Sequence, residues 1–365
     1  MSRWLFLAMD WSPAGGGIAR LLESLAAELP SGIDYRVLTL TPGLSDDRVF
    51  RVTTLRDMAL RLPGHVRWLR RGGEAQIVCA HVFLLPLALA ARGARGLRVS
   101  ALLYGREVMA PGGRHAVVRR LLPRAGRVVA ISDYTADLAR DCGVCSDRVR
   151  VVNPVIVPPW GIGMPPIRRP LDRGLRLVSV TRLTEGYKNL TLGLRAVAVL
   201  RDTGLVDRYT IVGDGALRPT LERFADDLGI RDIVRFTGQV TDDELAECIT
   251  EADLGLFPSR DSSAERGAEG FGLVVQEMAF AGLPVLVGDA GGTPDASDPA
   301  WSVLLDPYDV RAWVHEIDRL ARDEDARLRM AMSAFEWARE LDPRATSRAF
   351  YEAIADANPV RESRG

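Results

Sequence analysis

The 365-residue sequence lacks a hydrophobic stretch long enough to cross a membrane. Its longest apolar run covers residues 82–91 and is interrupted by Pro86. That run is about half of the ~20 residues that a membrane-spanning helix needs. The first ten residues carry one positive charge and end in an acid, which favours a first buried strand over a secretion signal. We therefore expect a cytoplasmic protein.

Cysteine is scarce, with only Cys79, Cys142, Cys145 and Cys248 in the chain. Cys142 and Cys145 form a CxxC pair, but no second pair or histidine cluster accompanies it. The spacing therefore predicts neither a zinc site nor a thioredoxin-like redox pair. We expect reduced, partly buried thiols that pack as small hydrophobic groups.

Lysine is almost absent, because Lys188 is the only lysine among the 47 basic residues. This singles Lys188 out for a role that arginine does not fill. The formal net charge is −1, but the charge is distributed unevenly. Residues 56–127 contain 14 arginines against Asp57, Glu74 and Glu107, a formal charge of +11. The rest of the chain is correspondingly acidic.

The composition is that of a globular protein, with 47% hydrophobic and 26% charged residues. The length suits two α/β domains better than one core. Short β-branched or apolar runs alternate with amphipathic stretches, which predicts doubly wound parallel sheets. The expected domains are residues 1–157 and 171–342, joined by a proline-rich linker at 158–170 and followed by a C-terminal helix at 343–365 that returns to the first domain.

The expected elements follow this alternation closely. In the first domain we expect strands at 4–8, 35–40, 76–80, 99–103, 127–131 and 149–152, with helices at 18–29, 115–122 and 134–141. In the second we expect strands at 175–181, 208–212, 233–236, 254–257, 284–287 and 302–305, with helices at 190–202, 217–228, 243–251 and 273–281. From residue 309 the pattern is helical, with a break at Pro343.

The most informative segment reads Glu269-Gly-Phe-Gly-Leu-Val-Val-Gln-Glu277. Gly270 and Gly272 permit a tight loop, and Leu273 begins a helix whose free backbone N–H groups favour an anion. Glu269 precedes that helix, whereas Glu277 lies inside it, slightly over one turn from Leu273. A carboxylate accepts two hydrogen bonds from a vicinal diol, so ribose hydroxyls are a natural partner for Glu277.

A second segment places two cations on one loop, because Arg182 and Lys188 follow the first expected strand of the second domain. They lie at the carboxyl end of that strand, where ligands bind in this architecture. Two cations there suit a diphosphate whose negative charge grows as it departs.

Two further glycine loops follow expected strands. The first is Ala14-Gly-Gly-Gly-Ile18 and the second is Val212-Gly-Asp-Gly-Ala216. The first departs from the GxGxxG dinucleotide fingerprint, because no third glycine falls three residues after the second. Its glycines still let a sugar or a phosphate approach the backbone.

Together, in this order and at these intervals, the four segments resemble the retaining glycosyltransferase family 4. The resemblance covers essentially the whole chain and is strongest over residues 175–295. It implies a GT-B fold, with two Rossmann-like doubly wound parallel-sheet domains that face a central cleft. It also implies that Arg182 and Lys188 hold the donor diphosphate, that Glu269 contacts the transferred sugar, and that Glu277 binds the ribose.

The resemblance implies further donor-site residues, with the glycines of the first domain closing over the donor from the opposite side. These residues are Gly15, Gly16, Tyr104, Gly213, Gly270, Phe271, Gly272 and Leu273. Tyr104, which precedes Gly105, departs from the family pattern, in which this position is usually a histidine. Tyrosine still forms hydrogen bonds but does not titrate near neutral pH. His81 follows another expected strand and is a candidate to replace the missing histidine, although a packed structural role for His81 is favoured.

The implied activity is retaining transfer of a sugar from a nucleotide sugar, with a UDP-sugar favoured. The acceptor is a hydroxyl of a small molecule, a natural product or a lipid-linked compound, handled by the first domain. The departing phosphate oxygen helps to deprotonate the acceptor on the same face, so catalysis depends on positioning and on neutralising the leaving group. Arg182, Lys188 and Glu269 are the expected catalytic residues. No metal is required, and Asp323-Glu-Asp325 is interpreted as solvated helix surface rather than as a metal motif.

Three alternatives stay open at this point. A nucleotide-sugar epimerase of the same fold would bind the donor and transfer nothing. A nicotinamide dehydrogenase is disfavoured by the missing fingerprint. A non-catalytic partner subunit that keeps the fold is motivated by Tyr104. No feature of the sequence indicates binding to nucleic acid.

The basic stretch at 56–127 has three interpretations. It belongs to ordinary amphipathic helices, to a site for a soluble anionic acceptor, or to a surface that meets anionic lipid at the inner membrane face. Residues 55–62 and 66–71 mix arginine with apolar residues, as a membrane-surface segment does, although Pro63 interrupts the pattern.

Overall fold

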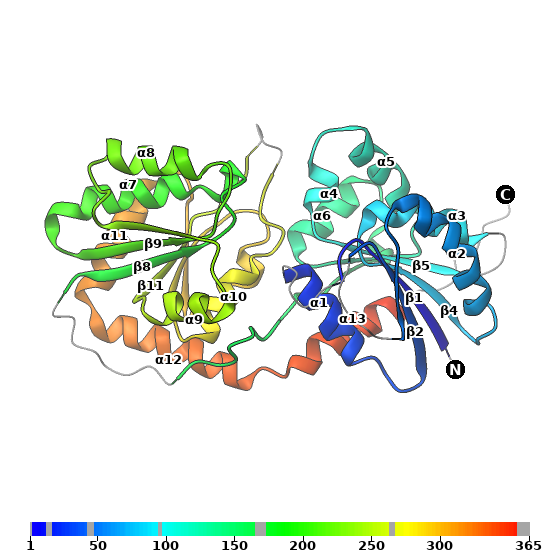
Figure 1. Cartoon of the computed structure of the whole chain (residues 1–365). Coiled ribbons are helices and arrows are strands. Elements are labelled where there is room, and N and C mark those ends of the chain that lie inside the picture. The colour runs from blue at the N-terminus through cyan, green and yellow to red at the C-terminus, as the bar shows by residue number, and fades with distance from the viewer. Residues whose placement is uncertain are drawn as a thin grey trace. The chain divides into compact units, whose positions relative to one another are not determined.

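The computed structural model describes residues 2–11, 17–41, 47–93, 97–164, 173–262 and 267–355. The chain divides into two compact α/β units (Figure 1). Unit 1 comprises residues 1–156 together with 342–365, and unit 2 comprises residues 157–341. Each contains a parallel sheet flanked by helices, which confirms the predicted fold class. Among the described helices, none combines the length and the apolar character that crossing a membrane requires.

Unit 1 is built on a seven-stranded sheet of order β3-β2-β1-β4-β5-β6-β7. Its strands are β1 (Ser2–Ala8), β2 (Ile33–Thr39), β3 (Val49–Arg51), β4 (Ala75–Cys79), β5 (Arg98–Leu103), β6 (Arg127–Ala130) and β7 (Val149–Val151). Its helices are α1 (Gly17–Ala27), α2 (Leu55–Leu69), α3 (Leu85–Arg92), α4 (Arg106–Met109), α5 (Gly113–Leu121), α6 (Asp133–Asp141) and α13 (Pro343–Ala355). Short 3₁₀ turns are η1 (Val82–Leu84), η2 (Leu122–Arg124) and η3 (Ser146–Arg148).

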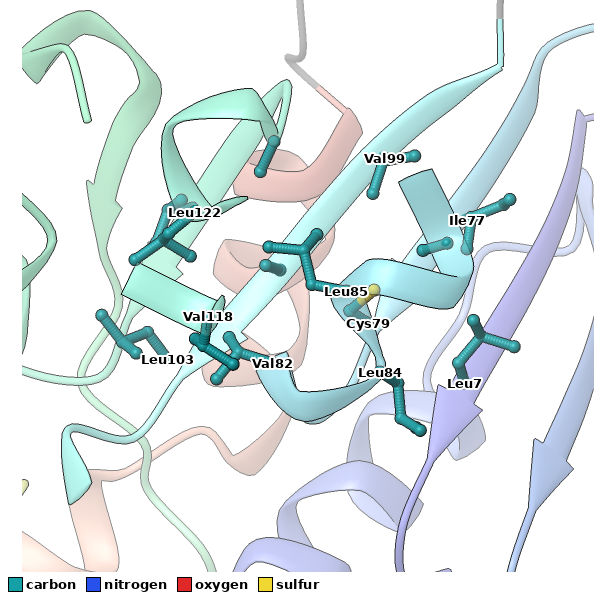
Figure 2. Close-up of a cluster of buried hydrophobic side chains, with 14 of the residues drawn as sticks. Leu7, Ile77, Cys79, Val82, Leu84, Leu85, Val99, Leu103, Val118 and Leu122 are labelled. Atoms are coloured by element: carbon teal, nitrogen blue, oxygen red, sulfur yellow. The ribbon is translucent and has the colours of Figure 1, made fainter. Parts of the chain in front are cut away.

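The core of unit 1 lies between its sheet and the helices that cover it. Figure 2 shows one part of this core, where side chains of β1, β4 and β5 meet those of η1, α3, α5 and η2. The labelled residues are Leu7, Ile77, Cys79, Val82, Leu84, Leu85, Val99, Leu103, Val118 and Leu122. The central strands are almost wholly apolar because helices cover parallel sheets on both faces, and burial of such side chains drives folding.

Helix α13 is the last of the described helices and packs in unit 1, beside α1 and β6. Tyr351 stacks on Trp4 of β1, with ring centroids 5.3 Å apart. The Ser347 hydroxyl donates to the backbone carbonyl of Ser24 at 3.3 Å. Phe350 and Ile354 are buried. The C-terminal helix therefore contributes part of the core of the unit that begins at the N-terminus.

Unit 2 is built on a six-stranded sheet of order β10-β9-β8-β11-β12-β13. Its strands are β8 (Leu175–Val180), β9 (Val206–Val212), β10 (Val234–Gly238), β11 (Leu254–Phe257), β12 (Val285–Gly288) and β13 (Ser302–Leu305). Its helices are α7 (Leu190–Leu200), α8 (Arg218–Asp227), α9 (Asp242–Thr250), α10 (Leu273–Phe280), α11 (Val310–Arg322) and α12 (Glu324–Glu340). Three 3₁₀ turns are η4 (Gly186–Lys188), η5 (Arg201–Thr203) and η6 (Pro294–Ala296).

Helix α2 differs from the expectation that Pro63 interrupts its pattern. The helix begins after Thr54, whose hydroxyl accepts a hydrogen bond from the Asp57 backbone N–H at 3.0 Å, and continues through Pro63 to Leu69. Proline removes one helical hydrogen bond. Pro63 lies on the exposed side of the helix, so water can satisfy the carbonyl that loses its partner.

Candidate donor site

The loop after β8 carries both cations that the sequence singled out. Lys188 ends the turn η4, and Asn189 follows it with a left-handed backbone (φ 55°). The Asn189 side-chain amide donates to the carbonyl of Pro307 at 2.8 Å. The backbone N–H of Arg260 donates to the carbonyl of Tyr187 at 2.9 Å. Two separate segments of unit 2 therefore fix the backbone on either side of Lys188.

The Lys188 ammonium forms an ion pair with the carboxylate of Glu269. The nitrogen also lies 5.2 Å from the ring centroid of Tyr187 and 5.8 Å from that of Phe257. The side chains of Lys188 and Glu269 are 10% and 18% exposed, so the pair is largely desolvated but still reachable from solvent. Two residues that the sequence places 81 positions apart thus meet directly.

The backbone of Glu269 is held by the loop that follows β12. The Gly292 N–H donates to the Glu269 carbonyl at 2.8 Å. Gly291 has a left-handed backbone (φ 60°), and a Cβ there would lie 2.5 Å from the same carbonyl oxygen. Glycine at 291 is therefore required both by its conformation and by the close approach of this carbonyl.

Helix α10 starts where the sequence predicted, immediately after Gly272 (φ 107°). Phe271 is buried beneath this start, and Leu273 is the first helical residue. Glu277 lies one turn further along and is 6% exposed. Positive partial charge at such a helix start favours a phosphate. The segment from Gly270 to Glu277 therefore combines a helix N-terminus with an acid inside the first two turns.

The Gly-Asp-Gly turn after β9 packs against the loop that carries Arg182. A Cβ on Gly213 would collide with the carbonyl of Thr181, and one on Gly215 would collide with the carbonyl of Leu183. The Leu183 N–H donates to the Asp214 carbonyl at 2.9 Å. Close backbone packing is thus a sufficient reason for both glycines, and it fixes the path of the loop.

Arg182 itself is 71% exposed, with a guanidinium nitrogen 3.8 Å from the carboxylate of Glu185. Glu185 is buried and also accepts a hydrogen bond from the Thr184 hydroxyl at 2.5 Å. Arg182 is therefore loosely held, in contrast to Lys188.

The remaining expected site residues lie in unit 1. Gly15 and Gly16 fall outside the described residues. Tyr104 follows β5 and is buried, and its hydroxyl has no hydrogen-bond partner. Gly105 (φ 106°) turns the chain into α4. Tyr104 lies in a cluster within unit 1, with its ring centroid 6.5 Å from that of His81.

The sequence analysis missed Glu107, which is buried beside Tyr104 with both carboxyl oxygens lacking a hydrogen-bond partner of good geometry. Burial raises the pKa of Glu107 to about 7, although nearby backbone N–H groups oppose that rise. Burial, with the neighbouring Glu107 charge adding to it, raises the pKa of Tyr104 well above its ordinary value. One acid in a stretch of arginines gave no signal that it is buried.

His81 is a neutral structural histidine in the same region. Its Nδ1 accepts a hydrogen bond from the Phe83 backbone N–H at 3.3 Å and so caps η1. Burial, with the charge of Arg114 adding to it, lowers the pKa of His81 to about 4. Its ring centroid lies 6.5 Å from that of Tyr104. This agrees with the packed histidine that the sequence favoured.

The DxD segment at 323–325 and the four cysteines lie within the described residues. No group of three or more His, Cys, Asp or Glu side chains there is arranged to hold a metal ion. Asp323 caps α12 by accepting from the Ala326 N–H at 2.8 Å. The four cysteines are free thiols.

Two surface hollows occur elsewhere in unit 2. One of about 340 Å³ lies between α7 and α11, and one of about 500 Å³ lies around the junction of α11 and α12. Neither is lined by Arg182, Lys188, Glu269 or Glu277. We identify the candidate site by its chemistry, because an ion pair beside a helix N-terminus is a better indicator of phosphate binding than the volume of a shallow hollow.

Two family models match the chain in succession. The model described as "Glycosyltransferase Family 4" matches residues 15–158, and that described as "Glycosyl transferases group 1" matches residues 169–337. Among solved structures, Anabaena HepE in complex with UDP is similar over 97% of this chain and 100% of that chain, with a TM-score of 0.77 at 18% identity. WaaG, a glycosyltransferase involved in lipopolysaccharide biosynthesis, has a TM-score of 0.68 over 96% of this chain and 100% of its own.

Several curated proteins are similar in sequence. The GDP-mannose-dependent alpha-(1-6)-phosphatidylinositol monomannoside mannosyltransferase of Mycolicibacterium smegmatis is 30% identical over 92% of this chain and 93% of its own length. The protein of the same name from Mycobacterium tuberculosis is 28% identical over 92% of this chain and 94% of its own length. The D-inositol 3-phosphate glycosyltransferase of Salinispora tropica is 35% identical over 58% of this chain and 42% of that protein. The chain therefore belongs to glycosyltransferase family 4: it is a retaining glycosyltransferase of GT-B fold that moves a sugar from a nucleotide sugar to a hydroxyl acceptor.

Proposed function

We propose that unit 2 binds the donor through Lys188, Arg182 and the start of α10. The observation that supports this most strongly is the ion pair between Lys188 and Glu269, beside the Gly-rich helix start. In this proposal the ammonium and the guanidinium bind the diphosphate, Glu269 contacts the transferred sugar, and Glu277 binds the ribose. Both cations stabilise the charge that develops on the leaving diphosphate.

The same two cations make a metal unnecessary in this proposal. A divalent ion commonly neutralises a departing diphosphate, and cationic side chains supply the same stabilisation. A phosphate oxygen of the departing group takes the proton from the acceptor hydroxyl on the same face of the sugar, so that no protein base is needed there. Transfer should then continue undiminished in the presence of a chelator.

The strongest argument for the identity of the donor comes from the relatives that match this chain over nearly its full length, whose names specify GDP-mannose. We propose GDP-mannose as the donor, with the UDP-sugar favoured by the sequence analysis as the rival. The names of the relatives also indicate a class of acceptor. One name contains phosphatidylinositol monomannoside and another contains D-inositol 3-phosphate, and each of these compounds has an inositol and a phosphate. We propose an anionic inositol-containing acceptor, carried on a lipid or free in solution.

Unit 1 offers a basic surface that suits such an acceptor. The exposed side of α2 presents Arg56, Leu60, Arg67 and Arg71 at helical spacing. Helix α3 packs beside α2, and α5, with exposed arginines of its own, packs beside α3. We call the exposed side of α2, residues 55, 56, 59, 60, 63, 64, 67, 70 and 71, the α2 face.

The acids of this region do not neutralise the α2 face. Asp57 pairs with Arg61 at 3.0 Å, Glu74 pairs with Arg98 at 3.6 Å, and Glu107 is buried. Leu60 is 73% exposed among the arginines. Exposed apolar groups within a positive surface favour contact with an anionic lipid interface. We therefore propose that the α2 face meets an anionic membrane that carries the acceptor.

The donor proposal is tested by thermal stabilisation with a panel of GDP-, UDP- and dTDP-sugars, because a ligand of the native state raises its melting temperature. GDP-mannose should stabilise the wild type and should not stabilise Lys188→Ala. Transfer by Lys188→Ala should fall by roughly a hundredfold or more, the scale of one lost preorganised contact. Lys188→Arg should rescue poorly, because a planar guanidinium replaces a compact ammonium.

Arg201→Ala is the matched control, since Arg201 is a cation of the same unit that pairs with Asp232 at the surface. It should retain wild-type stabilisation and transfer. Near-wild-type turnover in Lys188→Ala would remove the donor site from this part of unit 2.

A further inference from the structure

Both cations of the proposed donor site lie beside carboxylates of the protein itself. Lys188 pairs with Glu269, and Arg182 lies near Glu185. The first pair is the stronger, because both of its side chains are largely desolvated and solvent screens a buried pair less than an exposed one. The carboxylate of Glu269 therefore binds Lys188 in the way that a phosphate oxygen would.

The pair is preformed by the backbone rather than by flexible side chains alone. Asn189 and Tyr187 are fixed by hydrogen bonds to Pro307 and Arg260, and the carbonyl of Glu269 is fixed by Gly292. Neither backbone needs to move for the two charges to meet. A competing anion consequently has to displace a carboxylate that is already in place.

We propose that Glu269 is an internal competitor for Lys188, which the donor diphosphate displaces, so that diphosphate binding frees this carboxylate to contact the transferred sugar. This inference rests on the proposed donor site. A diphosphate carries more negative charge than one carboxylate and adds contacts with Arg182 and the helix start, so it wins the ammonium. Glu269 then loses its cation and gains the sugar hydroxyls as hydrogen-bond donors.

The proposal makes ligands with and without a sugar behave differently. A nucleoside diphosphate displaces Glu269 and offers it nothing in return. An intact nucleotide sugar displaces it and gives it hydroxyl groups to bind. Replacing Glu269 by glutamine should therefore favour the nucleoside diphosphate selectively, which a purely positioning role for Glu269 does not predict.

The experiment is calorimetric titration of GDP and GDP-mannose, or of the corresponding pair that stabilises the wild type. Glu269→Gln should bind the nucleoside diphosphate roughly five- to tenfold more tightly than wild type, the scale of one partly buried ion pair. For the nucleotide sugar this gain should shrink or reverse. In a Lys188→Ala background, Glu269→Gln should restore no binding of the nucleoside diphosphate, because the competitor then has no cation to occupy.

A charge control separates competition from general electrostatic relief. Asp261 follows Arg260, whose backbone N–H donates to the carbonyl of Tyr187, so Asp261 belongs to the segment that is hydrogen-bonded beside Lys188, while the ion pair of Lys188 is formed with Glu269. Asp261→Asn removes the same charge and should change nucleoside diphosphate affinity less than twofold, since an unpaired neighbouring charge acts weakly across solvent.

The outcomes are distinct. Equal or weaker binding of the nucleoside diphosphate by Glu269→Gln, with binding lost in Lys188→Ala, would overturn the competition and leave the donor site standing. Equal tightening by Asp261→Asn and Glu269→Gln would also overturn it. Unchanged binding in Lys188→Ala would remove the donor site itself.

Discussion

The burial of the polar side chains of Tyr104 and Glu107 costs unit 1 folding free energy. Three polar atoms of these two side chains are buried without hydrogen-bond partners. A buried carboxylate is far more costly than a buried carboxylic acid, so the protein favours a proton on Glu107. This is the physical origin of its raised pKa.

The first prediction concerns the pH dependence of that stability. The pKa of Glu107 rises from its ordinary 4.5 to about 7, so the folded state binds more protons than the unfolded state within this window. The contribution of Glu107 is then lost as the pH rises from 4.5 to 7 and stays lost above it. Glu107→Gln, which cannot ionise, should gain stability relative to wild type across this window, by roughly 3 kcal/mol at pH 8.

Denaturant melts of both proteins at several pH values measure this difference. The comparison with wild type is needed because His81 acts in the opposite direction. Its pKa is lowered to about 4, so its unfolded state binds more protons between 4 and 6.5, and stability rises with pH there. A difference between Glu107→Gln and wild type that does not vary from pH 5 to pH 8 would show that Glu107 titrates normally.

The second prediction concerns Gly291, whose close approach holds Glu269. Alanine at 291 would meet the carbonyl of Glu269 at 2.5 Å and move it, so transfer should fall by up to about a hundredfold, the scale of a 1 Å misplacement. Gly229→Ala is the matched control, because Gly229 is also left-handed (φ 67°) but has no atom within 4 Å of the added Cβ.

Both glycine variants should lose about 1 kcal/mol of stability, the cost of a left-handed alanine, and Gly291→Ala should lose more because its Cβ meets the carbonyl of Glu269. Only Gly291→Ala should also lose transfer activity. Parallel melting and turnover measurements separate the two effects, and equal turnover in the two variants would show that Gly291 does not position Glu269.

At the scale of elements, the pattern of apolar runs was sufficient to place most strands and helices of both units. The strands expected at 254–257 and 302–305 are β11 and β13 with the same bounds. Strand β3 escaped notice because three residues are too short to show an alternation. The continuous helix α2 was not predicted, because proline usually interrupts a helix, whereas Pro63 is accommodated on the exposed side of this one.

The candidate site was predictable only as separate segments, and its assignment stays a prediction. Local signals, such as a glycine before a helix or a cation after a strand, placed Arg182, Lys188 and the segment from Glu269 to Glu277. Contacts between distant segments were not visible, and the ion pair between Lys188 and Glu269 is the clearest case. Burial of a lone acid such as Glu107 is equally invisible, because it depends on the packing around it rather than on its neighbours in sequence.

The α2 face carries the third prediction. The protein should sediment with anionic vesicles and not with zwitterionic ones, and high salt should release it because each basic residue contributes about 1 kcal/mol that ions screen. Arg56→Glu, Arg67→Glu and Arg71→Glu together should weaken vesicle binding by roughly a hundredfold. Turnover of a soluble acceptor should be unaffected if the surface serves only the membrane.

Three exposed arginines of unit 2 provide the matched control. The triple reversal of Arg223, Arg235 and Arg329 changes the net charge equally and should leave vesicle binding close to wild type. If vesicles retain none of the wild-type protein even at low salt, the lipid surface is excluded and a soluble anionic acceptor becomes the interpretation of the arginines.

At the scale of the whole molecule, the two units are not consecutive halves of the chain. Unit 2 is continuous, whereas unit 1 includes helix α13 from the far end. Removing the chain after Leu341 deletes Phe350 and Ile354 from the core of unit 1 and uncovers Trp4. Each large apolar side chain contributes about 1.5–3 kcal/mol when buried, a large share of a domain's usual stability.

The fourth prediction is that a chain ending at Leu341 loses the folding transition of unit 1 and retains that of unit 2. Calorimetric melting should show one transition, which still shifts upward with the nucleoside diphosphate. Two unchanged transitions in the shorter chain would mean that α13 contributes little to unit 1.

Helix α13 also has a consequence for synthesis on the ribosome. The first 156 residues emerge early, yet the surface of β1 and α1 that α13 covers must wait until residues 343–355 follow. At roughly 5–20 residues per second, synthesis of the intervening unit takes on the order of ten seconds or more. Unit 2 should therefore complete its fold before the unit that precedes it. During that interval the nascent N-terminal unit exposes Trp4 and its apolar neighbours, so chaperones that bind nascent chains should associate with this protein until α13 is made.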